Sequence, residues 1–379
     1  MTNLIPSFGN IAFTMLFFVI ALSIIVAIHE YGHYIVGRWS GIHADVFSIG
    51  FGKVIWSRAD KRGTVWQIAA LPFGGYVKFK GDSNAASVGG DENVISGRDT
   101  MLGAPLWARS ATVAAGPIFN FILSFIVFAG ILLFQGQPIT PLTVSALPGF
   151  PENIEQQLEP GDRVLKVEGV ALNYPDGFGA AVANVPSQPS VEYEVQRDEL
   201  VVWRNGETFT TTLTPRLMAI PQADGSMMDE PKLGIGNGGL FFEPATTDVG
   251  IGESMKLAIQ QVWFIIKQSL NGLKQMIVGN INTCNLSGPV GIAETSGSMA
   301  SQGTLAFISF IAVLSTAVGM LNLFPIPILD GGHLCFHAYE AVTGKMPSDG
   351  ALRILMAIGL ALIGTLMLFA IGNDLLFCP

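Results

Sequence analysis

An apolar segment without any charge, residues 11–28, runs directly into the sequence His29-Glu30-Tyr31-Gly32-His33. Segment and motif together exceed the ~20 residues that a helix needs to cross a bilayer. Residues four apart share one helix face, so His29 and His33 are spaced to place two nitrogen ligands on one zinc ion. The glutamate beside the first histidine can accept a proton from water held by that metal. The segment therefore predicts a metal site inside a membrane.

The motif also has a second interpretation, because H-E-x-x-H occurs by chance on the solvated face of soluble helices. An apolar span makes that interpretation less favourable. Polar groups in the bilayer need partners, and Glu or His side chains there are costly unless they serve a function.

The composition extends this argument to the whole chain. Half of the residues are hydrophobic and only 13% are charged, against about 25% charged in ordinary soluble domains. We therefore predict a polytopic α-helical membrane protein with four transmembrane helices, at residues 11–34, 106–134, 304–323 and 351–371. A further stretch, residues 253–279, is apolar but interrupted by lysine and glutamine, which predicts an amphipathic helix on the membrane or against the bundle.

Charge is divided unevenly between the connecting segments. Residues 34–110 contain nine Lys or Arg and six Asp or Glu, whereas residues 140–250 contain six basic and sixteen acidic residues. The positive-inside rule then predicts residues 34–105 on the cytoplasmic side and residues 135–303 outside. The acidic segment argues against a nucleic-acid partner. Cys284 and Cys378 would both lie outside and are candidates for a pair on topology alone.

The segment after the first span is rich in glycine and β-forming residues. Residues 46–56, 64–71 and 75–79 are predicted as strands, which are apolar but too short to span. One interpretation is a membrane-associated β-hairpin sheet beside the helices, and the other is a small hairpin in the cytoplasm. In the first case the unpaired edge near Gly74 and Gly75 offers a binding site for an extended substrate.

Residues 137–248 read as an inserted soluble α+β domain. Predicted strands at 163–168, 191–195, 200–203 and 208–213 alternate with turns. The run from Leu158 to Val170, with Pro160-Gly161-Asp162 leading into a strand, resembles the hallmark of PDZ domains. Such domains bind peptides by strand addition, and this segment has room for one PDZ domain.

A second polar motif follows the third span, in the sequence Asn322-Leu-Phe-Pro-Ile-Pro-Ile-Leu-Asp-Gly-Gly-His333. Its two prolines interrupt the helix and free backbone carbonyls at membrane depth. The topology brings Asp330 to the same membrane face as the first motif. We favour Asp330 as a third ligand because its carboxylate would otherwise be buried unpaired, and two histidines with one carboxylate leave a fourth position for water. His333 and His337, also spaced i and i+4, remain alternatives.

These features together resemble the site-2 protease family, which are intramembrane zinc metalloproteases of the M50 type, and most closely the bacterial regulator-of-sigma-E protease branch. The likeness rests on the HEYGH helix, the NLFPIPILDGG segment and the PDZ domain between the second and third spans. It extends to Gly50–Gly52, Gly116–Asn120 and Leu286–Gly291. One departure is that the best-known members carry two tandem PDZ domains.

The resemblance implies a role for each matching residue. His29, His33 and Asp330 would bind Zn²⁺ and Glu30 would be the catalytic base, whereas Asn322, Pro325 and Pro327 would shape substrate handling. The predicted order is residues 1–40 with the first motif, 41–104 with the β region and a cytoplasmic loop, 105–136 with the second span, 137–248 with the PDZ domain, 249–303 with the amphipathic helix and a connector, 304–333 with the third span, and 334–379 with the fourth.

The resemblance also implies a zinc-dependent intramembrane endopeptidase of the bacterial inner membrane, surrounded by lipid. Its active site would face the cytoplasmic side and its PDZ domain the periplasm. The expected substrates are membrane segments of single-span proteins of the anti-sigma factor type, after a first cut elsewhere, and remnant signal peptides. A non-catalytic PDZ scaffold or chaperone is the alternative, but it does not explain Glu30. A transporter is a third, weakened because no pair of broken helices repeats across two halves.

Overall fold

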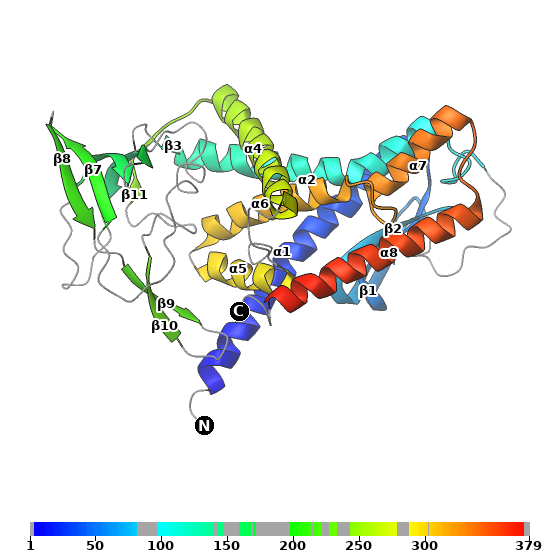
Figure 1. Cartoon of the computed structure of the whole chain (residues 1–379). Helices are drawn as coiled ribbons and strands as arrows, with labels where there is room; N and C mark the ends of the chain where they lie inside the picture. The colour runs from blue at the N-terminus through cyan, green and yellow to red at the C-terminus, as the bar shows by residue number, and fades with distance from the viewer. Residues whose placement is uncertain are drawn as a thin grey trace. The chain divides into compact units, whose positions relative to one another are not determined.

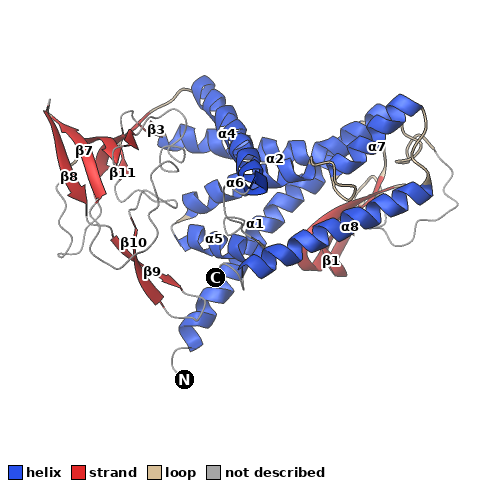
Figure 2. Ribbon diagram, viewed as in Figure 1, coloured by secondary structure: helices blue, strands red, loops and turns tan. Residues whose placement is uncertain are grey.

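The computed structural model describes residues 4–81, 97–138, 142–146, 159–167, 170–171, 198–205, 207–213, 216–221, 227–232, 243–278, 288–301 and 303–374. The chain divides into two compact units, residues 1–128 with 265–379, and residues 129–264. Figure 1 follows the chain from one terminus to the other. Figure 2 shows that the first unit is mainly helical with one small sheet, whereas strands are concentrated in the second.

Among the described residues, four helices are long and apolar enough to cross a membrane, as predicted. They are α1 (Leu4–Trp39), α2 (Leu106–Gln135), α6 (Thr304–Asn322) and α8 (Asp349–Gly372). The first helix continues five residues beyond its predicted end, because its last turns pack on the sheet. The core there contains Tyr34 of α1 together with Phe47 and Phe79 of the strands.

Glycine lets α1 and α2 approach closely. A Cβ atom on Gly32 would lie 2.5 Å from the carbonyl oxygen of Ala115 and 2.9 Å from Cβ of Phe119. Small residues at such contacts are typical of helix pairs in membranes, where backbone approach and van der Waals packing drive association. The contact lies within the HEYGH motif, so the motif helix and α2 are held together at the candidate site.

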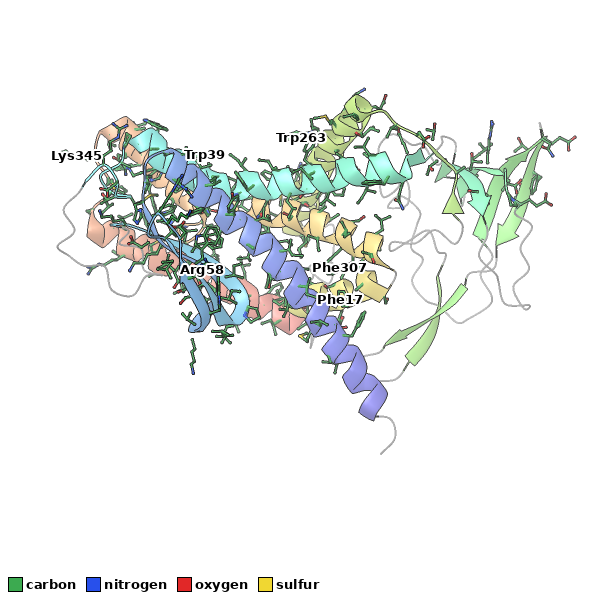
Figure 3. All side chains as sticks on the ribbon, turned by 180° about the vertical axis from the view of Figure 1, so that it is seen from behind. Phe17, Trp39, Arg58, Trp263, Phe307 and Lys345 are labelled. Atoms are coloured by element: carbon green, nitrogen blue, oxygen red, sulfur yellow. The ribbon has the colours of Figure 1, made fainter. Side chains whose placement is uncertain are left out.

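The third membrane helix, α6, is held by both apolar and polar contacts. Phe17 of α1 and Phe307 of α6 make an edge-to-face contact with ring centroids 4.9 Å apart, and Figure 3 shows them facing each other. On the other side, the Ser124 hydroxyl of α2 donates to the carbonyl of Ala312 at 2.7 Å. Ser315 of α6 donates to the carbonyl of Asn120 at 3.0 Å. These interhelical hydrogen bonds fix α6 against α2.

The small sheet of the first unit consists of β1 (Ala44–Ala59) and β2 (Val65–Phe79). Residues 46–49 pair on one side with 65–68 and on the other with 75–78, while residues 54–59 pair with 65–69. The two strands predicted at residues 64–71 and 75–79 are therefore a single strand, β2, which bends between them. Gly74 allows that bend, since its φ of +153° lies where other residues are strained.

The sheet lies alongside the membrane-spanning part of α1. A Cβ on Gly75 would lie 3.0 Å from Cγ1 of Val26, and Gly37, eleven residues later on α1, contacts the ring of Phe79. The outer part of the sheet exposes Ile55, Trp56 and Leu71, by 71%, 50% and 53%. Exposed apolar side chains beside a spanning helix favour a sheet in the bilayer over a hairpin in water.

Three further helices complete the described helical elements, namely α4 (Ile251–Val278), α5 (Pro289–Ser301) and α7 (Asp330–Thr343). The sequence predicts α4 but only a connector where α5 lies. The segment is rich in Gly, Ser and Thr, and tertiary contacts stabilise it as a helix. The Asp374 carboxylate accepts from the N–H groups of Gly288, Val290 and Gly291 at 2.9, 3.2 and 3.1 Å, which caps the start of α5.

The second unit contains the sheet order β11-β4-β5-β7-β8, with β6 beside β5, and two strand pairs, β9–β10 and β3–β12. The predicted strands at 163–168, 200–203 and 208–213 correspond to β5, β7 and β8, whereas 191–195 lies outside the described residues. These strands do not by themselves establish a PDZ domain.

Cys284 and Cys378 also lie outside the described part, and Cys335 is a free, exposed thiol. The strands are β3 (Gln137–Pro138), β4 (Leu142–Ala146), β5 (Arg163–Val167), β6 (Val170–Ala171), β7 (Asp198–Arg204), β8 (Glu207–Leu213), β9 (Arg216–Pro221), β10 (Met227–Lys232), β11 (Glu243–Pro244) and β12 (Thr246–Thr247).

The contact between α1 and α5 gives a prediction about stability. A Cβ on Gly297 would lie 3.0 Å from both Cα and Cβ of Thr14. We expect Gly297→Ala to destabilise the protein by about 1–3 kcal/mol through overpacking. Gly364→Ala in α8 is the matched control, because its Cβ would meet nothing within 4 Å. Thermal unfolding in detergent measures both variants, and equal stability of the two would show that the α1–α5 contact is not tight.

Candidate metal centre

The two histidines of α1 lie on one face of the helix, as their spacing of four requires. Their rings make an edge-to-face pair with centroids 4.7 Å apart. The Nε2 atoms of His29 and His33 point at the same region and are 3.1 Å apart. His29 is buried, and His33 is nearly so. Two imidazole nitrogens therefore converge at one point inside the helix bundle.

Asp330 completes this cluster from the other end of the sequence. Its Oδ2 lies 3.2 Å from Nε2 of His29 and its Oδ1 lies 3.5 Å from Nε2 of His33. Asp330 is the first residue of α7, where the helix dipole favours a negative charge. Gly331 and Gly332 follow it, and a Cβ on either would overlap the backbone of residues 323–327. The tight turn between α6 and α7 thus sets the position of the carboxylate.

The three side chains fit a divalent metal with nitrogen and oxygen ligands. One ligand atom from each lies within 4.8 Å of the others. Oδ2 of Asp330 is buried and, within the described residues, has no hydrogen-bond partner of suitable geometry. Two histidines and a carboxylate match the ligand set of catalytic zinc sites, which keep a fourth position for water or substrate.

A second layer of contacts orients the imidazoles. Nδ1 of His33 lies 2.8 Å from the carbonyl oxygen of Thr112 in α2, so it carries the proton and leaves Nε2 free as a ligand. Nδ1 of His29 lies 3.2 Å from the amide nitrogen of Asn120, whose Oδ1 has no partner in the described structure. Rotating that amide by 180° lets Oδ1 of Asn120 accept a hydrogen bond from Nδ1 of His29. Nε2 of His29 is then free to act as a ligand as well.

Glu30 lies beside the cluster and not in it. Its carboxylate interacts electrostatically with both histidines and with Asp330. It also accepts a hydrogen bond from the backbone N–H of Val77 in β2. A Cβ on Gly75 would lie 3.2 Å from Cγ of Glu30. The carboxylate is therefore situated between the candidate metal ligands and the edge of the sheet, where a base acting on bound water is needed.

The other predicted site residues lie at varying distances from this cluster. Gly75 is next to Glu30, whereas the contact of Gly74 is with the ring of Phe51. Asn322 is the last residue of α6, and Pro325 and Pro327 lie in the turn that leads to Asp330. No described contact joins Asn322, Pro325 or Pro327 to the histidines.

The cluster of His29, His33 and Asp330 includes neither of the alternative third ligands. His333 lies three residues after Asp330 on α7 and interacts electrostatically with Asp330 and His33, whereas His337 lies one turn further along the helix. Nδ1 of His337 lies 3.2 Å from the hydroxyl of Ser110 at the start of α2. Burial, reinforced by the nearby Arg109 guanidinium, lowers the pKa of His337 to about 4, so this side chain is neutral at physiological pH.

Sequence reasoning did not identify the residues that hold α7 in place. Arg109 of α2 donates two hydrogen bonds to Glu340 of α7, at 2.7 and 3.0 Å, and both side chains are largely buried. Planar, bidentate pairs of this kind fix relative geometry. An arginine at the start of an apolar helix needs a partner, and this was the only hint in the sequence. The sequence does not show which carboxylate is that partner.

Comparisons with known proteins identify relatives over nearly the whole chain. The sequence model for peptidase family M50 matches residues 17–366. A Rhizobium meliloti (strain 1021) protein named "putative zinc metalloprotease" is 36% identical over 372 residues, covering 97% of each chain. A protein of the same designation from Agrobacterium fabrum is 36% identical over 364 residues, 94% of each chain. Metalloprotease MmpA of Caulobacter vibrioides is 35% identical over 386 residues, 93% of each chain.

The closeness of α2 to the histidines gives a second prediction. A Cβ on Gly116 would overlap Nε2 of His33 and lie 2.8 Å from Cε1 of His29. We expect Gly116→Ala to weaken zinc binding at least as much as loss of a supporting contact does, about 10–100-fold. Gly130→Ala on the same helix is the control, since its Cβ would meet nothing within 4 Å. Competition with a chelator measures zinc affinity, and unchanged affinity in Gly116→Ala would place the metal elsewhere.

Proposed function

This chain belongs to peptidase family M50, the site-2 proteases, and we propose that it cleaves the membrane-spanning segments of single-span proteins. It is a membrane metalloendopeptidase that depends on zinc. The single observation that carries the assignment of its active site is the meeting of His29, His33 and Asp330, within 4.8 Å, beside Glu30. The proposal is thus that the first three residues hold the zinc ion and that Glu30 is the catalytic base.

The protein side chains have separate tasks in this mechanism. A zinc ion held here supplies Lewis-acid polarisation of the scissile carbonyl and of the attacking water. Thr112 and Asn120 keep the two imidazoles oriented, as their contacts with Nδ1 of His33 and of His29 indicate. Glu30 takes a proton from the water and returns it to the leaving amine. Its position in an apolar bundle limits the competing solvent around that proton.

Substrate must reach Glu30 in an extended form, because the peptide bonds of a helix are shielded by their own hydrogen bonds. The strand at residues 75–79 pairs with β1 on one side, and no other described strand pairs with its opposite side. The N–H of Val77 on this strand already bonds Glu30. Gly75 lets this strand pack closely against Glu30, since a Cβ there would lie 3.2 Å from Cγ of Glu30. These contacts support strand addition of the substrate at this edge. The side-chain amide of Asn322 is proposed to bind the substrate backbone near the cut.

The resemblance to the family supports a proposed substrate class, and the distribution of charge supports a proposed orientation in the membrane. Proteins of the anti-sigma factor type, after a first cut, and remnant signal peptides are the proposed substrates. The basic segment 34–105 supports a cytoplasmic active site in a bacterial inner membrane, with residues 137–248 on the periplasmic side as a PDZ domain. Support for the PDZ assignment comes from the Pro160-Gly161-Asp162 turn that leads into β5 (Arg163–Val167).

Three single variants test the assigned roles against each other. Glu30→Gln keeps the shape of the side chain but cannot accept a proton, so cleavage of a model transmembrane peptide should fall by about 10²–10⁴-fold while zinc stays bound. Asp330→Ala should lose both zinc and cleavage. His333→Ala should retain zinc, because the cluster of His29, His33 and Asp330 does not include that side chain. Metal analysis and the peptide assay, on the same purified samples, give both readouts.

The outcomes separate the possible errors. Near-normal cleavage by Glu30→Gln would show that Glu30 is not the catalytic base. Loss of zinc in His333→Ala, but not in Asp330→Ala, would show that the third ligand has been assigned wrongly.

The outer domain is proposed to limit access and to take no part in the chemistry. Replacing residues 140–245 by a short Gly/Ser bridge should leave zinc bound, since none of the proposed ligands lies there. The shortened protein should also cleave substrates that retain their outer domains, because a steric filter has been removed. A cleavage assay with full-length and truncated substrate, in both enzymes, measures this. If the deletion variant still rejects the full-length substrate, the domain is not a filter by size.

A further inference from the structure

A second polar site lies at the end of α1, beyond the metal centre. It is a pocket of about 270 Å³. Its lining comes from the last turns of α1, the loop that follows, and the turn between β1 and β2. The residues that carry its chemistry are Tyr34, Arg38, His43, Arg62 and Asp99. Nothing in the proteolytic mechanism uses this pocket.

Two arginines line the pocket, one with a side chain held by Tyr34 and the other on a turn whose backbone is held by Asp60. Nη1 of Arg38 donates to the hydroxyl of Tyr34 at 2.7 Å, and its guanidinium lies 5.7 Å from the centre of that ring. The backbone N–H of Arg62 donates to Oδ1 of Asp60 at 2.7 Å, which holds the β1–β2 turn. Asp60 is itself within 3.4 Å of the Tyr34 hydroxyl, so turn and helix are joined beneath the pocket.

The lining of the pocket contains two arginines and one carboxylate, Asp99, and the Asp60 carboxylate lies against Tyr34. Asp99 is paired with Lys80 at 2.6 Å, and His43 lies 3.7 Å from Asp45. Neither Arg38 nor Arg62 forms an ion pair with a carboxylate in the described part of the chain. Arginine presents donors in a planar fork that matches the geometry of phosphate, and its weak hydration suits binding at an interface.

The location of the pocket indicates which phosphate it meets. Arg38 is in the last turn of the helix whose spanning part is Ile11–Trp39. The next residue, Trp39, is 73% exposed, and Figure 3 shows it at the end of α1. Tryptophan is enriched where membrane helices pass the headgroup level, and basic residues there attract anionic lipid. The pocket is therefore level with lipid headgroups.

We propose that this pocket binds the phosphate group of an anionic phospholipid, with Arg38 and Arg62 as its ligands. A bound headgroup would join the end of α1 to the β1–β2 turn, the two elements that place Glu30 and the sheet edge. The proposal goes beyond the proteolytic function and does not depend on it, because lipid binding is measured without substrate or metal.

The test is a lipid titration of the full-length protein in detergent, read by native mass spectrometry. The probes are phosphatidylglycerol, phosphatidylcholine and inorganic phosphate. Arg38→Gln with Arg62→Gln should weaken phosphatidylglycerol binding roughly 25-fold, about fivefold for each guanidinium removed. Lys53→Gln with Arg58→Gln is the matched control, since it removes two exposed charges from the same sheet outside the pocket (Arg58 is labelled in Figure 3).

Each outcome decides the proposal. A loss confined to the pocket variant, with phosphatidylcholine bound weakly by all proteins, supports it. Equal losses in the pocket and control variants would overturn it in favour of general surface charge. Binding of inorganic phosphate without phosphatidylglycerol would overturn the lipid as the source. Arg62→Gln alone, at an exposed side chain with no part in the core, should show about a fivefold loss and keeps the test valid if the double variant does not fold.

Discussion

A carboxylate and two imidazoles face each other inside a bundle of apolar helices, and the remaining architecture of the first unit meets the demands of that arrangement. Ionisable groups in such surroundings need partners, and two further helices contribute them. Helix α2 supplies the Thr112 carbonyl and the Asn120 amide, and α7 supplies Asp330. Gly116 lets α2 pack against the two histidines, because a side chain at this position would overlap their rings.

The same helix, α1, serves several functions along its second half. Glu30 bonds the backbone of β2, Gly37 accommodates Phe79, and Arg38 lies at the polar pocket near its end. The sheet is thereby attached to α1 from the metal centre to the membrane surface. A change in the lipid bound at one end would act on the same two elements that position the base at the other. The fold thus connects the proposed lipid site to the proposed site of proteolysis through α1 and the sheet.

The positions of the other helices depend on polar contacts as much as on apolar packing. Ser315 of α6 bonds the carbonyl of Asn120, and Arg109 of α2 pairs with Glu340 of α7. In a membrane the lipid is as apolar as the helices, so apolar contacts alone choose partners weakly. Hydrogen bonds and close glycine contacts make one arrangement preferable to the others. This explains why the turn from residue 323 to 329, although it lacks regular structure, delivers Asp330 to a defined place.

Local patterns determined much of this protein. The length and composition of four apolar segments predicted the spans, and the spacing of His29 and His33 predicted a shared helix face, because both properties depend only on neighbouring residues. Helix α5 was not predicted, since its Gly, Ser and Thr content is unfavourable for a helix and the cap from Asp374 is 86 residues away from Gly288. The sequence favoured Asp330 as the third member of the cluster, and the structure places its carboxylate beside both histidines. Only the tertiary structure decided that Glu340 is the partner of Arg109 and that Gly75 lies next to Glu30. Such choices depend on how separate helices and strands pack, and a pattern within one segment carries no information about the packing of another.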